Sequence, residues 1–480
     1  MIIESHVVVI AGIVAWLGLG SMAAGHAIMF KRDARGSALW TIIAFTLPLL
    51  GPWLYWVLGI NRVKRRAIKL RAPVAAESPA AIPTDHALTE LDVQRALGHL
   101  ARLKRVTDRL SRFPLLAGNT VNPLHDGDEA YPAMLAAIES ATRSVTLASY
   151  IFEWDDVGRR FTDVLGSAAN RGVKVHVLLD GIGAVEAYSR VGRRLIRAGA
   201  EVAAFFPLRI PTGRLRLNLR NHRKIMVVDG RVGFTGGMNI SQKHCRAAPR
   251  RQRAEDLHFG IKGPVVAELQ AAFVEDWYLG TDKILDGDAY FPALTPDGPA
   301  QCRGICSGPD DPAEPIHWTI QAALSAAIRE VVIVTPYFIP SPALIAGMAI
   351  ASMRGIAIRL VLPSRVDRRF MRWAADAYLW QVLVHGVRVY HRPPPFVHTK
   401  LMIVDRQWVF LGSANLDPRS FRLNFEFNVE VYDAGLGGRL AAWLDDVLNG
   451  SREVTLEMVD GRSMPVRLRD GMVKLFSPYL

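Results

Sequence analysis

One short pattern occurs twice in this chain of 480 residues, and the repetition constrains the fold more than any other feature. The pattern is a histidine, a lysine two positions later and an aspartate five positions beyond the lysine. A single short pattern recurs by chance, but two copies in register predict an internal duplication. The six residues are His222, Lys224, Asp229, His398, Lys400 and Asp405.

The similarity between the two halves extends beyond this pattern. Three pairs of strand-like segments match: 145–152 with 331–338, 171–178 with 354–361, and 198–202 with 385–389. Helices are expected between these segments, at 130–141, 159–170, 316–328 and 343–353. Strands that alternate with helices predict an α/β fold with two similar domains, each a mixed sheet covered by helices.

Each copy of the pattern has a chemical interpretation. The apolar runs at 225–228 and 401–404 are typical of strands, in which side chains two positions apart share a face, so each histidine and its lysine point the same way. Imidazole is a nucleophile toward phosphorus and a proton carrier near neutral pH, and lysine is a compact cation for phosphate oxygens. Two facing pairs would therefore provide a nucleophile, an acid/base and a cationic cradle. Asp229 and Asp405 complete the candidate catalytic set, although their distance from the lysines indicates that they tie down a turn.

The N-terminal segment contains two apolar stretches, at 7–30 and 37–60. Each is long enough to cross a hydrocarbon core of about 30 Å, so we expect a transmembrane hairpin with a turn at 31–37. A cleaved signal peptide is disfavoured because no basic region precedes the first stretch. Basic residues are more numerous at 62–71 than in the turn, which indicates cytoplasmic catalytic domains.

Composition and these segments predict the organisation and the partners. We expect the hairpin and its basic flank at 1–71, a linker and helix at 72–121, a first catalytic domain at 122–295 and a second at 296–480. The net charge of +13 favours anionic partners, either lipid headgroups or nucleic acid. The apolar spans favour lipid and a membrane location. Three cysteines and the missing glycine-rich loop indicate no disulfide framework, no zinc site and no nucleotide cofactor.

The two patterns, with the glycine and asparagine segments at 236–239 and 412–420, resemble the phospholipase D superfamily. With two N-terminal spans ahead of the repeat, the chain more narrowly resembles bacterial cardiolipin synthases. This resemblance implies two phospholipase D-like domains around one pseudo-twofold active site. It also implies transfer of a phosphatidyl group between two phosphatidylglycerol molecules, giving cardiolipin and glycerol through a phosphohistidine, without a metal.

The resemblance assigns roles to individual side chains. His222 is the expected nucleophile and His398 the acid/base, and the near-symmetry of the repeat leaves the reverse assignment open. Lys224 and Lys400 are expected to stabilise charge on the transferring phosphate. The expected phosphate-binding residues are Asn239, Ser413 and Asn415. Gly237 takes the place of the serine in the first half, where its amide would have to substitute.

A nucleophilic imidazole needs its second nitrogen held, usually by a carboxylate. Asp256 follows His222 and Glu426 follows His398 on apolar, strand-like runs, at places where the family carries such a residue. We assign both as orienting residues, with Glu255 as the rival of Asp256.

Other functions remain open from the sequence alone. A phospholipase D that hydrolyses lipid and a phosphodiesterase acting on nucleic acid share this chemistry, and an inactive membrane-tethered lipid-binding protein would share the fold. Two complete patterns argue against the binding protein, and the apolar spans argue against the nuclease. The acceptor, phosphatidylglycerol or another alcohol such as phosphatidylethanolamine, and the oligomeric state are left open.

Overall fold

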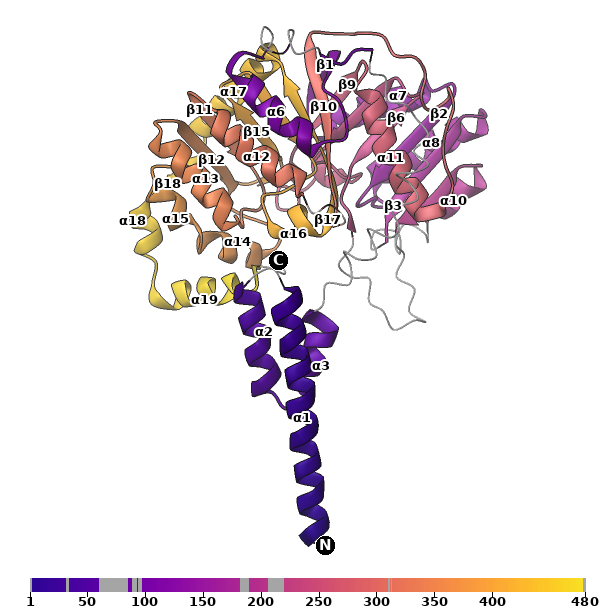
Figure 1. Ribbon diagram of the computed structural model, residues 1–480. Helices are drawn as coiled ribbons and strands as arrows, with labels where there is room; N and C mark the ends of the chain where they lie inside the picture. The colour runs from indigo at the N-terminus through magenta and orange to yellow at the C-terminus, as the bar shows by residue number, and fades with distance from the viewer. Residues whose placement is uncertain are drawn as a thin grey trace. The chain divides into compact units, whose positions relative to one another are not determined.

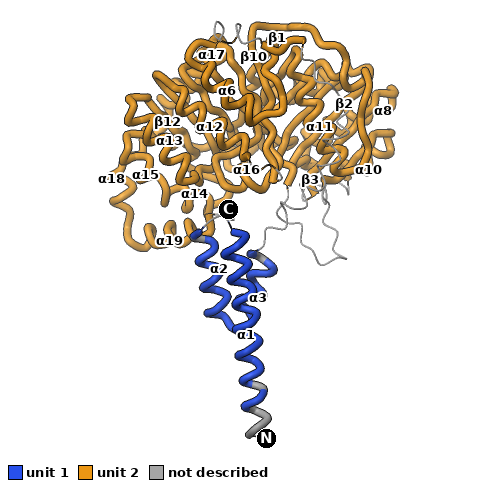
Figure 2. Tube along the Cα trace, viewed as in Figure 1, with its two compact units in different colours: residues 1–69 blue, residues 70–480 orange. Residues whose placement is uncertain are grey.

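The computed structural model describes residues 2–31, 34–59, 85–88, 93, 97–181, 190–205, 220–309, 311 and 313–477. The chain divides into two compact units, residues 1–69 and residues 70–480 (Figure 2). The predicted basic flank at 62–71 and most of the predicted linker lie outside the described residues.

Unit 1 consists of apolar helices: α1 (Ile2–Phe30), α2 (Ala34–Thr46), α3 (Leu50–Leu54) and a π-helical turn η1 (Tyr55–Gly59). Within α1, the segment Val9–Phe30 is long and apolar enough to cross a membrane. The second predicted span is interrupted between α2 and α3. Pro48 lies at this interruption, where it has no N–H for the helix and disfavours helical backbone at the residue before it. The two-helix hairpin is therefore not seen as two unbroken spans.

Unit 2 is built on one sheet of 16 strands, counted over the described residues, whose two halves repeat one strand order. Figure 1 shows the two halves on either side of β1 and β10. The order β4-β3-β2-β6-β7-β9 in the first half corresponds to β13-β12-β11-β15-β16-β17 in the second. In each half the first three strands are parallel and the others antiparallel. The predicted duplication of a mixed α/β sheet is confirmed.

The strands of the first half are β2 (Ser144–Ser149), β3 (Lys174–Asp180), β4 (Glu201–Phe205), β6 (Ile225–Val228), β7 (Val232–Gly236) and β9 (Leu257–Lys262). Those of the second are β11 (Glu330–Val334), β12 (Ala357–Pro363), β13 (Arg388–Arg392), β15 (Leu401–Val404), β16 (Trp408–Gly412) and β17 (Asn424–Tyr432), with β18 (Arg452–Val454) at the edge. Two antiparallel strands, β1 (Leu116–His125) and β10 (Ala300–Ser307), join β9 to β17. The duplication therefore forms one continuous sheet.

Helices flank this sheet in matching positions. The first half carries α7 (Asp126–Glu139), α8 (Asp156–Asn170), α10 (Val191–Arg197) and α11 (Val266–Thr281). The second carries α12 (Pro315–Ala326), α13 (Pro342–Met353), α15 (Leu379–Leu383) and α17 (Ala434–Asn449). The side chains of Asp155 and Ser341 cap α8 and α13 by accepting backbone N–H groups, which explains why both helices begin where they do.

Each half has its own apolar core. In the first, Val145, Val177 and Phe161 pack between the sheet and helices α7 and α8. In the second, α6 (Ala101–Leu110) contributes Leu103 to the core around Val331. Because both cores are filled by strands and helices that flank the patterned segments, the histidine-bearing ends of the strands are held on rigid supports.

Candidate active site

Short strands at the junction of the halves position the two histidines. His222 follows β5 (Arg220–Asn221), which pairs in parallel with the start of β17, and the His222 N–H donates to the Phe425 carbonyl at 2.9 Å. His398 follows β14 (Phe396–Val397), which pairs with β8 (Ala254–Glu255), and its N–H donates to the Glu255 carbonyl at 2.7 Å. Each histidine is thus tied to a strand of the opposite half.

The orienting carboxylates are crossed between the halves. His222 Nδ1 lies 3.0 Å from Glu426 Oε2, and His398 Nδ1 lies 2.7 Å from Asp256 Oδ2. Spacing along the chain had associated each histidine with the carboxylate that follows it, and that pairing is wrong. The reason is the strand pairing just described, because Glu426 and Asp256 directly follow the residues whose carbonyls accept the histidine N–H groups.

Glu255, the rival of Asp256, points elsewhere. Its carboxylate binds Arg253 at 3.2 Å and Arg392 at 2.9 Å, and within the described part of the chain this carboxylate contacts neither histidine. Asp256 is only 3% exposed, and it also accepts the backbone N–H of Leu257 at 2.8 Å. The geometry therefore favours Asp256 as the residue that holds His398.

Both lysines lie beside their histidines and are buried. Lys224 Nζ donates to the His222 carbonyl at 2.7 Å, and Lys400 Nζ donates to the His398 carbonyl at 2.5 Å. Lys400 Nζ also lies 3.1 Å from both ring nitrogens of His398. Burial lowers the pKa of Lys224 to about 7 and that of Lys400 to about 8, since a charged ammonium loses hydration. An anionic phosphate would restore their full charge.

Burial also lowers the pKa of both imidazoles. It lowers the pKa of His222 to about 4 against the opposing attraction of Glu426, and it lowers the pKa of His398 to about 4 with help from Lys400. Burial would raise the pKa of the two carboxylates, but the cations beside them hold the pKa of Glu426 and of Asp256 below their usual ranges. Ionised carboxylates that accept from Nδ1 leave each Nε2 as the reactive nitrogen of a neutral ring.

The phosphate-binding role predicted for Ser413 does not match its position. The Ser413 hydroxyl is buried and donates to Glu426 Oε2 at 2.5 Å, so it supports the carboxylate behind His222. Gly237 takes the corresponding place beside Asp256, where an added Cβ would lie 2.5 Å from both carboxylate oxygens. The glycine therefore makes room for the shorter aspartate, which explains the difference between the repeats.

The two asparagines do line a shared cavity of about 870 Å³ together with His222 and His398. Asn239 Oδ1 accepts the backbone N–H of Ile151 at 3.2 Å, which orients its amide. Asn415 is 6% exposed, and its Oδ1 has no hydrogen-bond partner among the described residues. Both amides are therefore available to a bound group.

The motif aspartates lie at the far ends of β6 and β15. Asp229 accepts the backbone N–H groups of residues 142–144, and Asp405 accepts those of residues 328–330. His99 Nε2 also binds Asp405, at 2.7 Å. Each carboxylate fixes the end of its strand to the backbone at the start of the neighbouring strand, β2 or β11. These two residues therefore do not belong with the histidines and lysines as catalytic groups.

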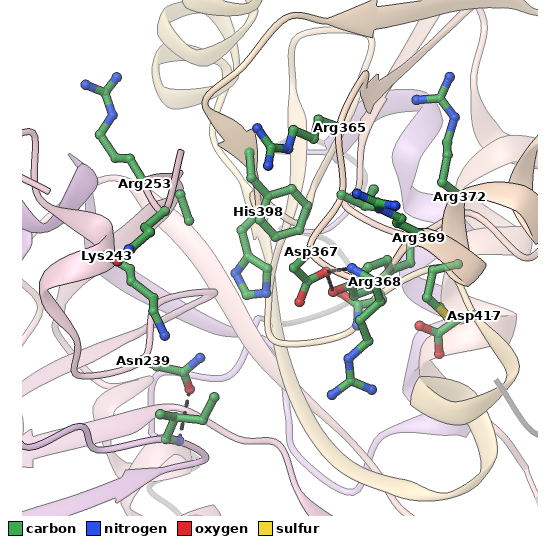
Figure 3. Close-up of a pocket in the computed structure, with 18 of the residues that line it drawn as sticks. Asn239, Lys243, Arg253, Arg365, Asp367, Arg368, Arg369, Arg372, His398 and Asp417 are labelled. Atoms are coloured by element: carbon green, nitrogen blue, oxygen red, sulfur yellow. Dashed lines mark hydrogen bonds between the residues drawn. The ribbon is translucent and has the colours of Figure 1, made fainter. Parts of the chain in front are cut away.

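The cavity is strongly cationic. Figure 3 shows His398 between Lys243 and Asn239 on one side and the segment from Asp367 to Arg369 on the other. Among the described lining residues, Asp367 and Asp417 are the acidic ones. The arginines that line it are Arg220, Arg250, Arg251, Arg253, Arg365, Arg368, Arg369, Arg372 and Arg419. Such a lining attracts anionic substrates.

Arg220 is a further residue of the site, and the repeated pattern assigns it no role. It is 1% exposed and lines the cavity, and its guanidinium lies 3.7 Å from Asp180. None of its three side-chain nitrogens has a hydrogen-bond partner in the described part of the chain. A buried guanidinium without hydrogen bonds is costly unless a ligand provides them. The sequence signal was its position two residues before His222, where the second half has Phe396.

Comparison with known proteins identifies the family. The family model described as cardiolipin synthase, PLD-like domain matches residues 134–277 and 320–449, one segment in each half. The chain belongs to this family. A second model, the phospholipase D-nuclease N-terminal segment, matches residues 18–59 in unit 1.

Known relatives match over nearly the whole chain. It is 36% identical to cardiolipin synthase A of Pseudomonas putida strain GB-1 over 473 residues, which is 96% of each protein. It is 35% identical to cardiolipin synthase A of Pseudomonas aeruginosa strain LESB58, covering 96% of this chain and 94% of the relative. The crystal structure of phosphatidylserine synthase from Haemophilus influenzae Rd KW20 shares the fold, with a TM-score of 0.62 at 15% identity over 79% of this chain and 100% of that one.

Proposed function

We propose that the protein is a membrane-held cardiolipin synthase that joins two phosphatidylglycerol molecules and releases glycerol. The observation that carries this proposal is the pair of crossed histidine–carboxylate contacts at one cation-lined cavity. Identity of 35–36% to cardiolipin synthases of two Pseudomonas species, over 96% of this chain, supports the same activity. This geometry supports a scheme in which two imidazoles act on a single substrate phosphate.

In the first step, His222 Nε2 attacks the phosphorus of one phosphatidylglycerol. The bond from phosphorus to the headgroup glycerol breaks as His398 donates a proton to the departing oxygen. Asp256 stabilises the His398 imidazolium that this step requires, and the phosphate charge raises the imidazole pKa toward neutrality. The products are a phosphatidyl-His222 intermediate and free glycerol.

In the second step, His398 removes a proton from a glycerol hydroxyl of the second phosphatidylglycerol. That oxygen attacks phosphorus, and the bond to His222 breaks, which gives cardiolipin and restores both histidines. Lys224, Lys400, Asn239 and Asn415 stabilise the additional charge on the phosphate oxygens during both steps. These cations and amides do this without a metal in the proposed scheme.

Synthesis requires that lipid rather than water reaches the intermediate. A cavity with nine lining arginines supports two anionic lipids as donor and acceptor. The apolar helix of unit 1 supports lipid rather than nucleic acid as the substrate class. The apolar helix in unit 1 supports a bilayer location. We retain the two-span arrangement with cytoplasmic catalytic domains as part of this proposal, with α2 and α3 together forming the second span.

The test is product analysis with the purified full-length protein in phosphatidylglycerol vesicles. Mass spectrometry should find cardiolipin and glycerol in equal amounts, with phosphatidic acid as a minor product. His222→Asn and His398→Asn should each be inactive while remaining folded, because neither imidazole replaces the other. Phosphatidic acid as the main product at every lipid density would establish a hydrolase instead.

A further inference from the structure

The C-terminal helix α19 (Met464–Lys474) carries an exposed apolar surface. Its apolar residues follow helical spacing, so they lie on one stripe that continues into the two residues after the helix. Their exposed fractions range from 57% to 83%. We call this set the α19 stripe: Met464, Leu468, Met472, Leu475 and Phe476.

The opposite side of α19 is firmly held against unit 2. Val473 packs with Met371 and Ala374, and Lys474 Nζ lies 4.7 Å from the centre of the Tyr378 ring. The Ser477 hydroxyl lies 3.1 Å from the Tyr378 hydroxyl. The α19 stripe is therefore the outward side of a packed helix, and a contiguous exposed apolar surface of this kind marks an interaction site.

The charged residues beside the α19 stripe indicate the kind of surface that it binds. Arg467 borders it on one edge and Arg469 on the other, by helical geometry. The helix has one acidic residue, Asp470, which is 1% exposed and paired with Arg462 and Arg469. An apolar stripe bordered only by cations fits the interface of an anionic lipid bilayer, where both features contribute to binding.

The position of α19 connects it with the active-site cavity. It packs beside α14 (Arg369–Asp376), as Figure 1 shows, and the guanidinium of Arg469 lies 4.4 Å from the centre of the Trp373 ring. Arg369, Arg372 and Trp373 of α14 line the cavity. A bilayer bound to α19 would therefore lie one helix away from the substrate cavity.

We propose that α19 is an interfacial helix that inserts its apolar stripe into the headgroup region of an anionic bilayer and holds the cavity near its lipid supply. This is a membrane contact of unit 2 itself, separate from the apolar helix of unit 1. The inference rests on the proposed function for the identity of the substrate, and on the α19 surface for the contact.

Kinetics of the full-length chain test the consequence of this contact. The variant Leu468→Ser/Met472→Ser/Leu475→Ser should lose about five-fold or more of its rate on phosphatidylglycerol vesicles, since much of the buried apolar area is gone. It should keep its rate on short-chain phosphatidylglycerol that is monomeric in solution. The matched control Ile196→Ser/Ile284→Ser/Ile350→Ser changes three exposed apolar residues in other parts of the chain and should behave as wild type in both assays. Equal loss on both substrates, or no loss on vesicles, would overturn the proposal.

A binding readout separates this proposal from the proposed function. Leu468→Cys in the full chain is labelled with an environment-sensitive fluorophore and reconstituted in phosphatidylglycerol vesicles with brominated acyl chains. We expect strong quenching at position 468 and none at a matched Ile196→Cys label, with the native cysteines as a common background. This result would support the contact even if no cardiolipin were formed. A label shielded by another copy of the chain or by unit 1 would escape quenching and would contradict it.

Discussion

The two halves of the active site share a backbone and differ in the side chains around each histidine. His222 is held by a glutamate that a serine hydroxyl supports, and a buried arginine precedes it by two residues. His398 is held by a shorter aspartate beside Gly237, and Phe396 takes the place of the arginine. The duplication therefore reproduced the positions of the imidazoles, while the surrounding charges diverged, which allows two similar histidines to have different roles.

The crossed contacts make each half of the site dependent on the other. Each histidine takes its backbone partner and its carboxylate from the other half. A single half would present an imidazole without an oriented Nδ1, so neither half contains a complete site. The continuous sheet through β1 and β10 keeps the two halves in the register that these contacts need.

Among changes to the residues around the histidines, removal of the carboxylates should have the largest effect. Asp256→Asn and Glu426→Gln should each lower kcat by about a hundred-fold or more, because the histidine loses its orientation. Asp256 raises the pKa of His398, so Asp256→Asn lowers that pKa and should shift the alkaline limb of the pH–rate profile to lower pH. Glu426→Gln should leave that limb in place, since the nucleophile acts in its neutral form.

Glu255→Gln is the matched control for these variants. Its carboxylate contacts arginines rather than a histidine, so activity should stay within about two-fold of wild type. If Asp256→Asn left the pH profile unchanged and Glu426→Gln shifted it, the roles of the two histidines would be reversed.

Exchange of the small residues beside the two carboxylates should lower kcat more at Gly237 than at Ser413. Gly237→Ser forces a Cβ against both oxygens of Asp256 and should lower kcat by about twenty-fold. Ser413→Gly removes one hydroxyl from Glu426 and should lower kcat by about five-fold. Steady-state kinetics with circular dichroism as the folding check would measure both. A harmless Gly237→Ser would refute the explanation given for the missing serine.

Variants of Arg220 and Phe396 test whether the two halves bind phosphate unequally. Arg220→Gln should lower kcat/KM by about ten-fold, because one charge-assisted contact to phosphate is lost. Arg220→Lys should recover part of this loss, and Phe396→Leu should change kcat/KM by about two-fold. Kinetics over a range of phosphatidylglycerol surface densities would measure these effects. Equal losses for Arg220→Gln and Phe396→Leu would argue against a phosphate contact in the first half.

The motif aspartates should affect stability and leave chemistry nearly unchanged. Asp229→Asn and Asp405→Asn should each cost about 2 kcal/mol of unfolding free energy, because charged acceptors of several backbone N–H groups are lost. Burial opposes ionisation, but those N–H groups hold the pKa of both carboxylates below its ordinary value. The stabilisation is therefore present above the unfolded-state pKa and is lost as pH falls through the folded one. Thermal denaturation in detergent would measure the effect, and a large drop in kcat of the folded variants would return these residues to the catalytic set.

Local patterns made much of the fold predictable from the sequence. The expected helix at 159–170 lies within α8, and the expected strand at 145–152 overlaps β2, because strand and helix periodicities are read over short windows. The interruption at Pro48 was not predicted from the sequence, because a continuous kinked helix and a broken helix have the same hydropathy profile.

The candidate site was harder to predict than the fold. The histidines and lysines carry a spaced pattern, and the common cavity of the two histidines is consistent with the duplication. The crossed carboxylates depend on two-residue strands, β5 and β14, that pair with distant segments. The missing hydrogen bonds of Arg220 depend on three-dimensional packing. Neither of these features has a periodic sequence signal.

The most direct test of the shared two-histidine site is the position of the covalent intermediate. The substrate is a phosphatidyl ester of nitrophenol, whose leaving group departs without a proton and so does not need the general acid. Rapid quenching and peptide mass spectrometry should find the phosphatidyl group on His222 in wild type, more of it in His398→Asn, and none in His222→Asn. A phosphatidyl group on His398, or its absence from all three proteins while nitrophenol is released, would contradict the assignment.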